Sequence, residues 1–418
     1  MSLASVAQAE AKLLLPTYER NPLLFEKGRG VYLFDAQGRR YLDFLSGIGV
    51  NALGYNHPAI RKALVEQSER LVHISNLFFH RGQSDLAKLL TEMSGLDRAF
   101  FCNSGTEAFE AALKLARAYA RAKNSNGHRP KWRFLALENS FHGRTFGSLA
   151  ATSTKKYRQP FAPLMPGVSF VRFNDVEDLK AKFDSKVCAL CLEPVQGEGG
   201  IRAVSKKFFQ AARALAQENG ALLIADEIQC GLGRTGKYFA YQHYGIAPDI
   251  VTVAKPLAAG LPLGAVLTTE AVSRVIHPGM HGTTFGGGPL ACSVAIAFLE
   301  TLERENLVRH VAEMGAYCKD ELLTLQERHA CIVEVRGLGL MLGAELNSAD
   351  LAKSVARSML NAGIIINRTH ETVLRFLPPY IVSKKEIDHV IQNLDRALSQ
   401  KQGKAVTAAR ARHLKESS

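Results

Sequence analysis

The residue best suited to chemistry in this sequence is Lys255, which ends an apolar run. The run covers 250–254, and Pro256 and a glycine-spaced turn follow the lysine. An ammonium at the buried end of a hydrophobic strand is costly unless it is paired, neutralised or used covalently. Lys255 is therefore a candidate Schiff-base lysine.

A second apolar run, 221–225, ends in Asp226. Both runs have the pattern of buried parallel strands, and ligands collect at the carboxyl ends of such strands. We therefore expect Asp226 and Lys255 to face one pocket. Pyridoxal 5'-phosphate requires an amine for its aldehyde and an anion for its pyridinium nitrogen, so this pair predicts that cofactor.

A candidate phosphate site lies at 103–107, after a predicted strand and at the start of a helical pattern. Free N–H groups and the helix dipole favour an anion there, and Gly105 permits close approach. The alternative is a plain N-cap by Ser104 with Glu107 at the third helical position. The loop 281–289 also precedes a helix; its hydroxyls could complete a phosphate cup, or it could be a structural glycine-rich turn.

Two further loops follow predicted strands. Phe141 could cover a planar ring and Arg144 could clamp a carboxylate with two hydrogen bonds, although such residues are more often core and surface. The segment 193–198 carries carboxylates that are either ordinary loop charges or partners of an arginine that substrates share. The loop 231–238 matches GxGxxG, but it lacks a following periodic helix, and Tyr238 replaces the hydroxyl residue of a P-loop.

Composition indicates a globular enzyme. The chain has 418 residues, 47% hydrophobic and 22% charged, with a net charge of +13. Lys and Arg are scattered, and the segment 401–418 holds five of them against one Glu, so nucleic-acid binding is not predicted. Seven cysteines in apolar runs indicate a reducing compartment, and without a leader pattern or an apolar stretch near 18 residues we predict a soluble cytoplasmic protein.

The order of elements predicts an α/β fold with a mostly parallel sheet. A hairpin is expected at 31–45, strands and helices then alternate to about residue 299, and a smaller α+β unit follows, with a last helix from Ser383 to about Gln400. The CxxC of Cys188 and Cys191 is interpreted as core strand. The predicted division has four parts. Residues 1–56 form an N-terminal segment that contributes to the small domain, and residues 57–300 form a large cofactor-binding domain. Residues 301–400 form a small C-terminal domain, and residues 401–418 form a frayed or disordered basic tail.

The ordered motifs resemble those of the class III (subgroup II) pyridoxal-phosphate aminotransferases of fold type I, most closely the acetylornithine aminotransferases. The motifs are NSGTEA, FHGRT, EPVQGEGG, ADEIQCGLGRTG, the lysine strand and HGTTFGG, and the resemblance runs from about Tyr18 to Gln400. It implies that Lys255 forms the Schiff base, Asp226 binds the pyridine nitrogen and Gln229 lies near the phenolic oxygen. The resemblance also implies that Phe141 and Ile228 contact the cofactor ring. The phosphate would be bound by Gly105 and Thr106, and by Thr284 of the partner subunit.

The resemblance also implies the substrate contacts and an obligate homodimer with active sites at the subunit interface. Arg144 would hold the α-carboxylate, and Thr283 would lie in the substrate pocket. Glu198 would mask Arg375 when the donor has a neutral distal end, and the pair would open for glutamate or 2-oxoglutarate. The implied activity is ping-pong transfer from acetylornithine to 2-oxoglutarate in arginine biosynthesis.

Alternative donors remain open within that resemblance: succinylornithine, ornithine, 4-aminobutyrate and carrier-bound lysine. Ile48 stands where ornithine transaminases typically have a tyrosine, which favours an acetylornithine donor. Pro256 and Gly288 depart from the usual pattern and affect loop rigidity and pocket shape. Two other classes, a nucleotide-binding hydrolase using 231–237 and a non-catalytic basic binding protein, fit the sequence less well.

Overall fold

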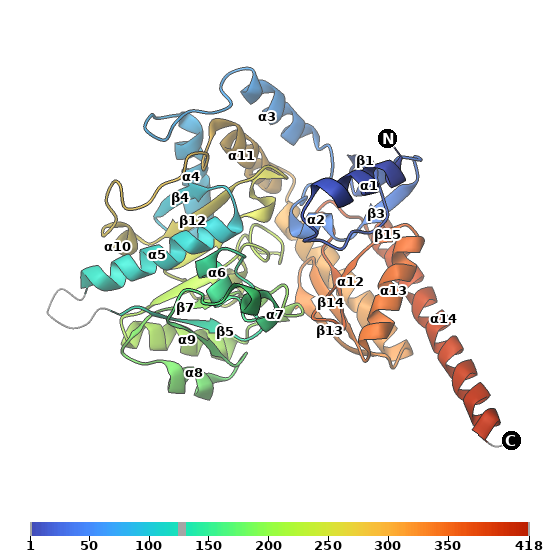
Figure 1. Ribbon diagram of the computed structural model, residues 1–418. Helices are drawn as coiled ribbons and strands as arrows, with labels where there is room; N and C mark the ends of the chain where they lie inside the picture. Colours follow the sequence, from blue (N-terminus) through green and yellow to red (C-terminus); the bar gives the residue numbers. More distant parts are fainter. Residues whose placement is uncertain (1, 124–130, 417–418) are drawn as a thin grey trace.

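The centre of the molecule is a seven-stranded sheet with the order β4-β12-β11-β10-β7-β5-β6 (Figure 1). The computed structural model describes residues 2–123 and 131–416, with side chains as far as residue 400. Only β12 runs antiparallel to its neighbours, so the expected mostly parallel sheet is confirmed. The strands are β4 (Arg98–Cys102), β5 (Arg133–Leu137), β6 (Val168–Val171), β7 (Val187–Leu192), β10 (Leu222–Asp226), β11 (Ile250–Val253) and β12 (Gly264–Thr268).

Helices cover both faces of this sheet, which explains why its strands read as continuous apolar runs. In β10, Leu222 and Ile224 pack in the core cluster that contains the alanine-rich face of α5 (Gly105–Lys123). Leu223 and Ala225 point the other way, into the cluster that contains Phe208 and Phe209 of α9 (Lys206–Glu218). Because side chains alternate along a strand, Asp226 lies on the same side as Ile224, toward α5.

The other helices around the large sheet are shorter or lie toward its edge. Figure 1 shows α3 and α4 beside α11, away from α8 and α9. These helices are α3 (Pro58–Ser68), α4 (Arg81–Ser94), α6 (Phe146–Ala151), α7 (Lys155–Arg158), α8 (Val176–Lys182), α10 (Glu270–Ser273) and α11 (Pro289–Arg304). Short 3-10 helices follow at η1 (Gln159–Phe161), η2 (Ala240–His243) and η3 (Lys255–Ala258).

The N-terminal and C-terminal parts of the chain contribute strands to one sheet. The N-terminal sheet has the order β1-β2-β3-β15, and its fourth strand comes from the C-terminal part of the chain, where Ile364 pairs with Leu42. This region contains α1 (Leu3–Leu13), β1 (Phe25–Arg29), β2 (Tyr32–Asp35), β3 (Arg40–Asp43), α2 (Ser46–Gly49) and β15 (Ile364–Ile365). The expected hairpin at 31–45 is thus confirmed as β2 and β3.

A second four-stranded sheet, β13-β14-β17-β16, forms the C-terminal part (Figure 1). Its elements are α12 (Leu307–Arg328), β13 (Ile332–Leu338), β14 (Met341–Leu346), α13 (Ala349–Asn361), β16 (Asn367–Thr369), β17 (Val373–Phe376) and α14 (Lys384–Glu416). The helices α12 and α13 pack against the sheet, and α14 packs against these two helices. A small hairpin of β8 (Val195–Gln196) and β9 (Arg202–Ala203) follows β7, and β9 contacts β13 of the C-terminal sheet. The domain limits at 56, 300 and 400 stay predictions.

The C-terminal segment differs from the expectation. The last helix begins as predicted, because the Glu386 carboxylate accepts hydrogen bonds from the backbone N–H and hydroxyl of Ser383. It was expected to end near Gln400, but α14 continues to Glu416. The predicted helix end was wrong because polarity and charge were weighed above helix propensity, and Ala, Lys and Arg are good helix formers. Fraying or disorder of the segment 401–418 stays a prediction.

Two further features agree with the sequence. Cys188 and Cys191 lie in β7 among fully buried residues, as core strand, and all seven cysteines are buried. Within residues 2–123 and 131–416, no helix is long and apolar enough to cross a membrane.

Candidate active site

A cavity of about 430 Å³ lies at the carboxyl ends of β10 and β11. Asp226 ends β10 and Lys255 follows β11, and both line this cavity, so the structure brings the two residues together as expected. The other predicted site residues that line it are Gly105, Thr106, Phe141, Arg144, Glu198, Ile228 and Gln229.

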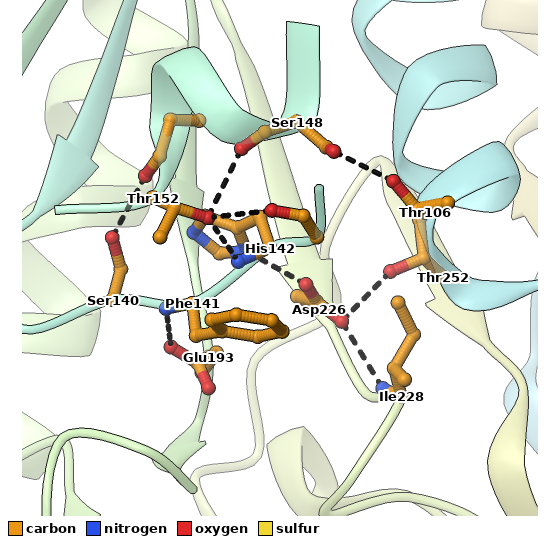
Figure 2. Close-up of polar contacts among 12 residues, drawn as sticks. Thr106, Ser140, Phe141, His142, Ser148, Thr152, Glu193, Asp226, Ile228 and Thr252 are labelled. Carbon is orange, nitrogen blue, oxygen red and sulfur yellow. Dashed lines mark hydrogen bonds and ion pairs between the residues drawn. The ribbon is translucent and has the colours of Figure 1, made fainter. Parts of the chain in front are cut away.

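Asp226 is held rigidly at the buried end of the cavity (Figure 2). One carboxylate oxygen accepts hydrogen bonds from the Thr252 hydroxyl at 3.1 Å and the Ile228 backbone N–H at 3.1 Å. The other lies 2.7 Å from His142 Nδ1. A carboxylate has about four lone-pair sites, so one acceptor position remains for a ligand.

His142 and Glu193 were not singled out from the sequence. His142 is buried and stacks on Phe109, with ring centroids 4.2 Å apart. Glu193 is also buried and accepts hydrogen bonds from the backbone N–H groups of Phe141 at 3.1 Å and Gly197 at 3.2 Å. Burial raises the pKa of Glu193 to about 7. A histidine beside Phe141 and a glutamate at the end of β7 were the only signals, and neither has a distinctive spacing.

The backbone of Lys255 has a conformation that is unusual for a residue other than glycine. Its φ is 42°, in the left-handed region, and Pro256 follows it in η3. Burial lowers the pKa of the Lys255 amine, and the nearby Asp226 and Glu198 charges oppose that effect. The amine makes no hydrogen bond or ion pair within the part of the chain that the structure describes, which leaves it open to the cavity.

The opposite end of the cavity is the N-terminus of α5. Ser104 caps this helix, because its hydroxyl accepts a hydrogen bond from the Glu107 N–H at 3.3 Å. The Thr106 hydroxyl lies 2.6 Å from that of Ser148 and 2.8 Å from that of Thr145. The cap and an anion site are therefore compatible: one hydroxyl satisfies one N–H, and the helix start still faces the cavity.

Glu198 and Arg375 form an ion pair at the side of the cavity, with Arg375 Nη1 2.5 Å from Glu198 Oε1. The Arg375 guanidinium is buried and also donates to Asn367 at 3.0 Å and to Gln229 Oε1 at 3.2 Å. Glu198 is 31% exposed. Burial raises the pKa of Glu198, but the charges of Arg375 and Lys255 and the hydrogen bonds from Arg375 and Gln229 together outweigh it, so the pKa is lowered overall.

The structure separates Thr283 and Thr284 from this cavity within one chain. Both line a second hollow of about 1030 Å³ together with the exposed residues Leu77, Phe78 and Phe79. Thr283 reaches toward the first cavity only through Asn103, whose amide donates to the Thr283 hydroxyl at 3.2 Å.

The loop 231–238 contains no phosphate-binding arrangement, because Arg234 is buried and directed into the protein. Its guanidinium donates to the carbonyls of Leu340, at 3.1 Å, and Pro378. It also lies over the Tyr380 ring at 4.5 Å. Through these contacts of Arg234 the loop packs against the C-terminal part of the chain, consistent with its interpretation as a shaped loop beside the site.

The residues around the cavity fit pyridoxal phosphate at each of its polar groups. Lys255 supplies an amine with no competing partner among the described residues, Asp226 a buried carboxylate with one acceptor position left, and the start of α5 a set of N–H groups. Phe141 and Ile228 supply apolar surface for the ring. A side chain at Gly105 would lie 2.9 Å from Ile228, so glycine is required for the close packing of these two segments.

This fold and site define the chain as a member of the class-III aminotransferases, whose family model matches residues 15–398. It is therefore a pyridoxal-phosphate-dependent transferase of fold type I. The chain is 47% identical to the acetylornithine aminotransferase of Methanocaldococcus jannaschii over 96% of this chain and 99% of the relative. It is 44% identical to that of Caldanaerobacter subterraneus subsp. tengcongensis, over 94% and 98%.

Solved structures agree with this assignment. An ornithine aminotransferase from Toxoplasma gondii is similar with a TM-score of 0.92 at 32% identity, over 97% of this chain and 96% of that one. An acetylornithine aminotransferase from Elizabethkingia anophelis has a TM-score of 0.85 at 29% identity, over 96% and 100%. The predicted family, fold class and cofactor are thus confirmed.

Proposed function

We propose that this chain transfers the δ-amino group of N-acetylornithine to 2-oxoglutarate, forming glutamate, as a step of arginine biosynthesis. The observation that carries the proposal is the similarity, over nearly the whole chain, to relatives named acetylornithine aminotransferase. The Glu198–Arg375 pair supports it, because N-acetylornithine has one carboxylate where glutamate has two, so Arg375 needs Glu198 to neutralise it while this donor is bound. Ile48 also supports it, because it stands where ornithine transaminases typically have a tyrosine that helps to grip the donor carboxylate.

The reaction depends on what Lys255 and Asp226 do at the two ends of the cofactor. When bound, pyridoxal phosphate carries the amino group and delocalises the electrons released at the substrate carbon. Lys255 would hold the cofactor through its amine, and the same amine, when free, would accept and return the proton of the substrate carbon. Asp226 would bind the pyridine nitrogen and keep it protonated. Gln229, which lines the same cavity, would contact the phenolic oxygen.

Two arginines select the substrate. Arg144 binds the single carboxylate of N-acetylornithine, and one of the two carboxylates of glutamate or 2-oxoglutarate, through paired hydrogen bonds. Arg375 binds the second carboxylate of glutamate or 2-oxoglutarate after Glu198 moves aside. Because Glu198 is partly exposed and lies between glycines in the loop 197–200, it is the mobile partner, and the buried Arg375 stays in place.

We also propose a homodimer in which each subunit completes the other's site. Thr283 and Thr284 lie outside the cavity of their own chain, on a surface where Leu77 is 88% exposed and Phe79 fully exposed. Large apolar side chains in one exposed patch mark an interaction surface. A second copy covering this patch would bring Thr284 to the phosphate and Thr283 to the substrate pocket. Active protein with the mass of one chain in solution would contradict this arrangement.

A cytoplasmic location is part of the same proposal. All seven cysteines are buried, and six of them, Cys102, Cys188, Cys191, Cys230, Cys292 and Cys318, are free thiols, as expected in a reducing compartment, where structural disulfides are rare. Secretion into an oxidising compartment would contradict it, as judged by fractionation of the native cell.

The donor is tested by single-turnover absorbance of the purified holoenzyme. Acetylornithine, ornithine, succinylornithine and 4-aminobutyrate are added separately without 2-oxoglutarate, and loss of the visible cofactor band is followed. We expect acetylornithine to bleach the band with the highest second-order rate constant. A higher constant for another amine would keep the aminotransferase and change its substrate, and a protein without any band after loading would contradict the proposal altogether.

Glu198→Ala is expected to shift specificity toward dicarboxylates. Removing Glu198 leaves Arg375 buried without its carboxylate, and an unpaired buried charge is unfavourable by about 2–5 kcal/mol. A substrate carboxylate relieves this, so the ratio of kcat/KM for glutamate over acetylornithine should rise at least about tenfold. The matched control is Glu334→Ala, which removes a carboxylate from another arginine, Arg336, away from the cavity. An unchanged ratio in the Glu198 variant would contradict the proposed switch.

A further inference from the structure

The guanidinium of Arg144 is positioned by aromatic rings and by no polar group among the residues that the structure describes. Its central carbon lies 3.7 Å from the ring centroid of Tyr157 and 5.6 Å from that of Phe141. Within the described residues its side chain makes no hydrogen bond or ion pair. Arg144 lines the cavity and is exposed, so without the rings its long side chain would be free to adopt other rotamers.

Stacking on an aromatic face leaves the hydrogen-bonding edge of a guanidinium free. The N–H groups of arginine lie in the guanidinium plane, whereas the attraction to a ring acts through its face. A contact at 3.7 Å therefore fixes the plane of Arg144 without using the donors that a carboxylate needs. An ion pair with an acidic residue would fix the side chain too, but it would compete with the substrate.

Tyr157 is well placed to act on both Arg144 and Phe141. It belongs to the one-turn helix α7, and its ring meets that of Phe141 edge-on, at 86° and 6.3 Å between centroids. The chain from 140 to 157 is closed on itself: the Ser153 N–H donates to the Ser140 carbonyl at 2.9 Å, and the Ser140 hydroxyl to the Ala151 carbonyl at 2.8 Å. The returning segment therefore carries Tyr157 back beside the outgoing Phe141 and Arg144.

We propose that Tyr157 is a positioning residue for substrate recognition, which holds Arg144 in the orientation that binds a substrate carboxylate. This inference rests on the proposed function of Arg144. Tyr157 does not line the cavity and acts through Arg144. Both half-reactions use a carboxylate on Arg144, so Tyr157 affects the binding of amino donor and 2-oxoglutarate alike, and it has little effect on an amine without a carboxylate.

The test compares Tyr157→Leu with Tyr157→Phe in the holoenzyme, using single-turnover kinetics at increasing substrate. Leucine fills space without an aromatic face, whereas phenylalanine keeps the face and removes the hydroxyl. We expect Tyr157→Leu to raise the apparent Kd of acetylornithine, glutamate and 2-oxoglutarate about tenfold, within the range that cation–π contacts contribute. The limiting rate should change less than about threefold, and Tyr157→Phe should stay within about twofold of the native protein.

Three controls separate this role from general damage. The rate constant for pentylamine, which has no carboxylate, should be unchanged in Tyr157→Leu, and titration with the non-reactive dicarboxylate glutarate, followed by the cofactor band, should show the same weakening as glutamate. Equal slowing of pentylamine, or equal defects in the Leu and Phe variants, would overturn the inference. If Tyr157→Leu fails to fold, Tyr157→Met replaces it, with the same expected outcome.

Arg144→Gln distinguishes failure of the inference from failure of the proposed function. Weaker carboxylate binding in Arg144→Gln together with native binding in Tyr157→Leu would overturn the role of Tyr157 alone. Native carboxylate binding in Arg144→Gln would overturn the carboxylate clamp itself.

Discussion

Lys255→Ala is expected to lower turnover by about 10⁴-fold or more, since it removes the proposed covalent partner of the cofactor, which is also the proposed base for the substrate proton. The variant should also lose the visible band of the lysine-bound cofactor and show free cofactor released on gel filtration. Turnover is measured with acetylornithine and 2-oxoglutarate at saturating concentrations, and the band by absorbance of the purified protein.

The control for this experiment is Lys206→Ala, an exposed lysine at the start of α9, which should keep full turnover and the band. Thermal unfolding of both variants checks that the fold is intact. Substantial turnover by Lys255→Ala would sink the mechanism, because no other lysine lines the cavity among the described residues.

The second large effect is expected for Asp226→Asn, which keeps the shape of the side chain and removes its negative charge. Without that charge the pyridine nitrogen is no longer held protonated, so the cofactor stabilises electrons at the substrate carbon poorly. We expect both half-reaction rate constants to fall by about 10³-fold, a loss typical of removing one electrostatic contact at a reacting centre. Stopped-flow absorbance with acetylornithine and then 2-oxoglutarate measures each half separately.

Asp249→Asn is a matched control at the opposite end of the same two strands. The Asp249 carboxylate accepts hydrogen bonds from Arg213 and from the Leu223 N–H, both far from the cavity. Its replacement should lower the melting temperature and leave the half-reaction rates within about threefold. Comparable rate losses in the two variants would show that Asp226 acts through stability instead of chemistry.

Much of the large sheet could be predicted because its strands are apolar on both sides. The runs 187–192 and 250–254 have no polar face, so they can only be buried strands or helix segments, and their length favours strands. Lys255 and Asp226 stood out for the same reason, as charges at the ends of such runs. Because the two predicted strands are parallel, their carboxyl ends lie at the same edge of the sheet, and the two side chains were therefore expected to lie close together.

The features that were missed depend on contacts distant in sequence. The pairing of β15 with β3 joins residues more than 300 positions apart, and nothing local to Ile364 specifies it. His142 and Glu193 became visible as site residues only after β5, β7 and β10 were adjacent. The continuation of α14 beyond Gln400 was missed for the opposite reason. The helix propensity of the local sequence determines the structure there, whereas the prediction relied on the polarity and charge of the segment.

The backbone around Lys255 has a consequence for how the amine moves. The lysine lies in a left-handed conformation and Pro256 fixes the next residue, while Leu257 and Ala258 are buried and the Leu257 N–H bonds to the Ala254 carbonyl at 3.0 Å. The amine is therefore a nucleophile on a tether of four methylene groups whose anchor does not shift. Its reach confines it to a small volume, which keeps its effective concentration at the reacting carbon high throughout the catalytic cycle.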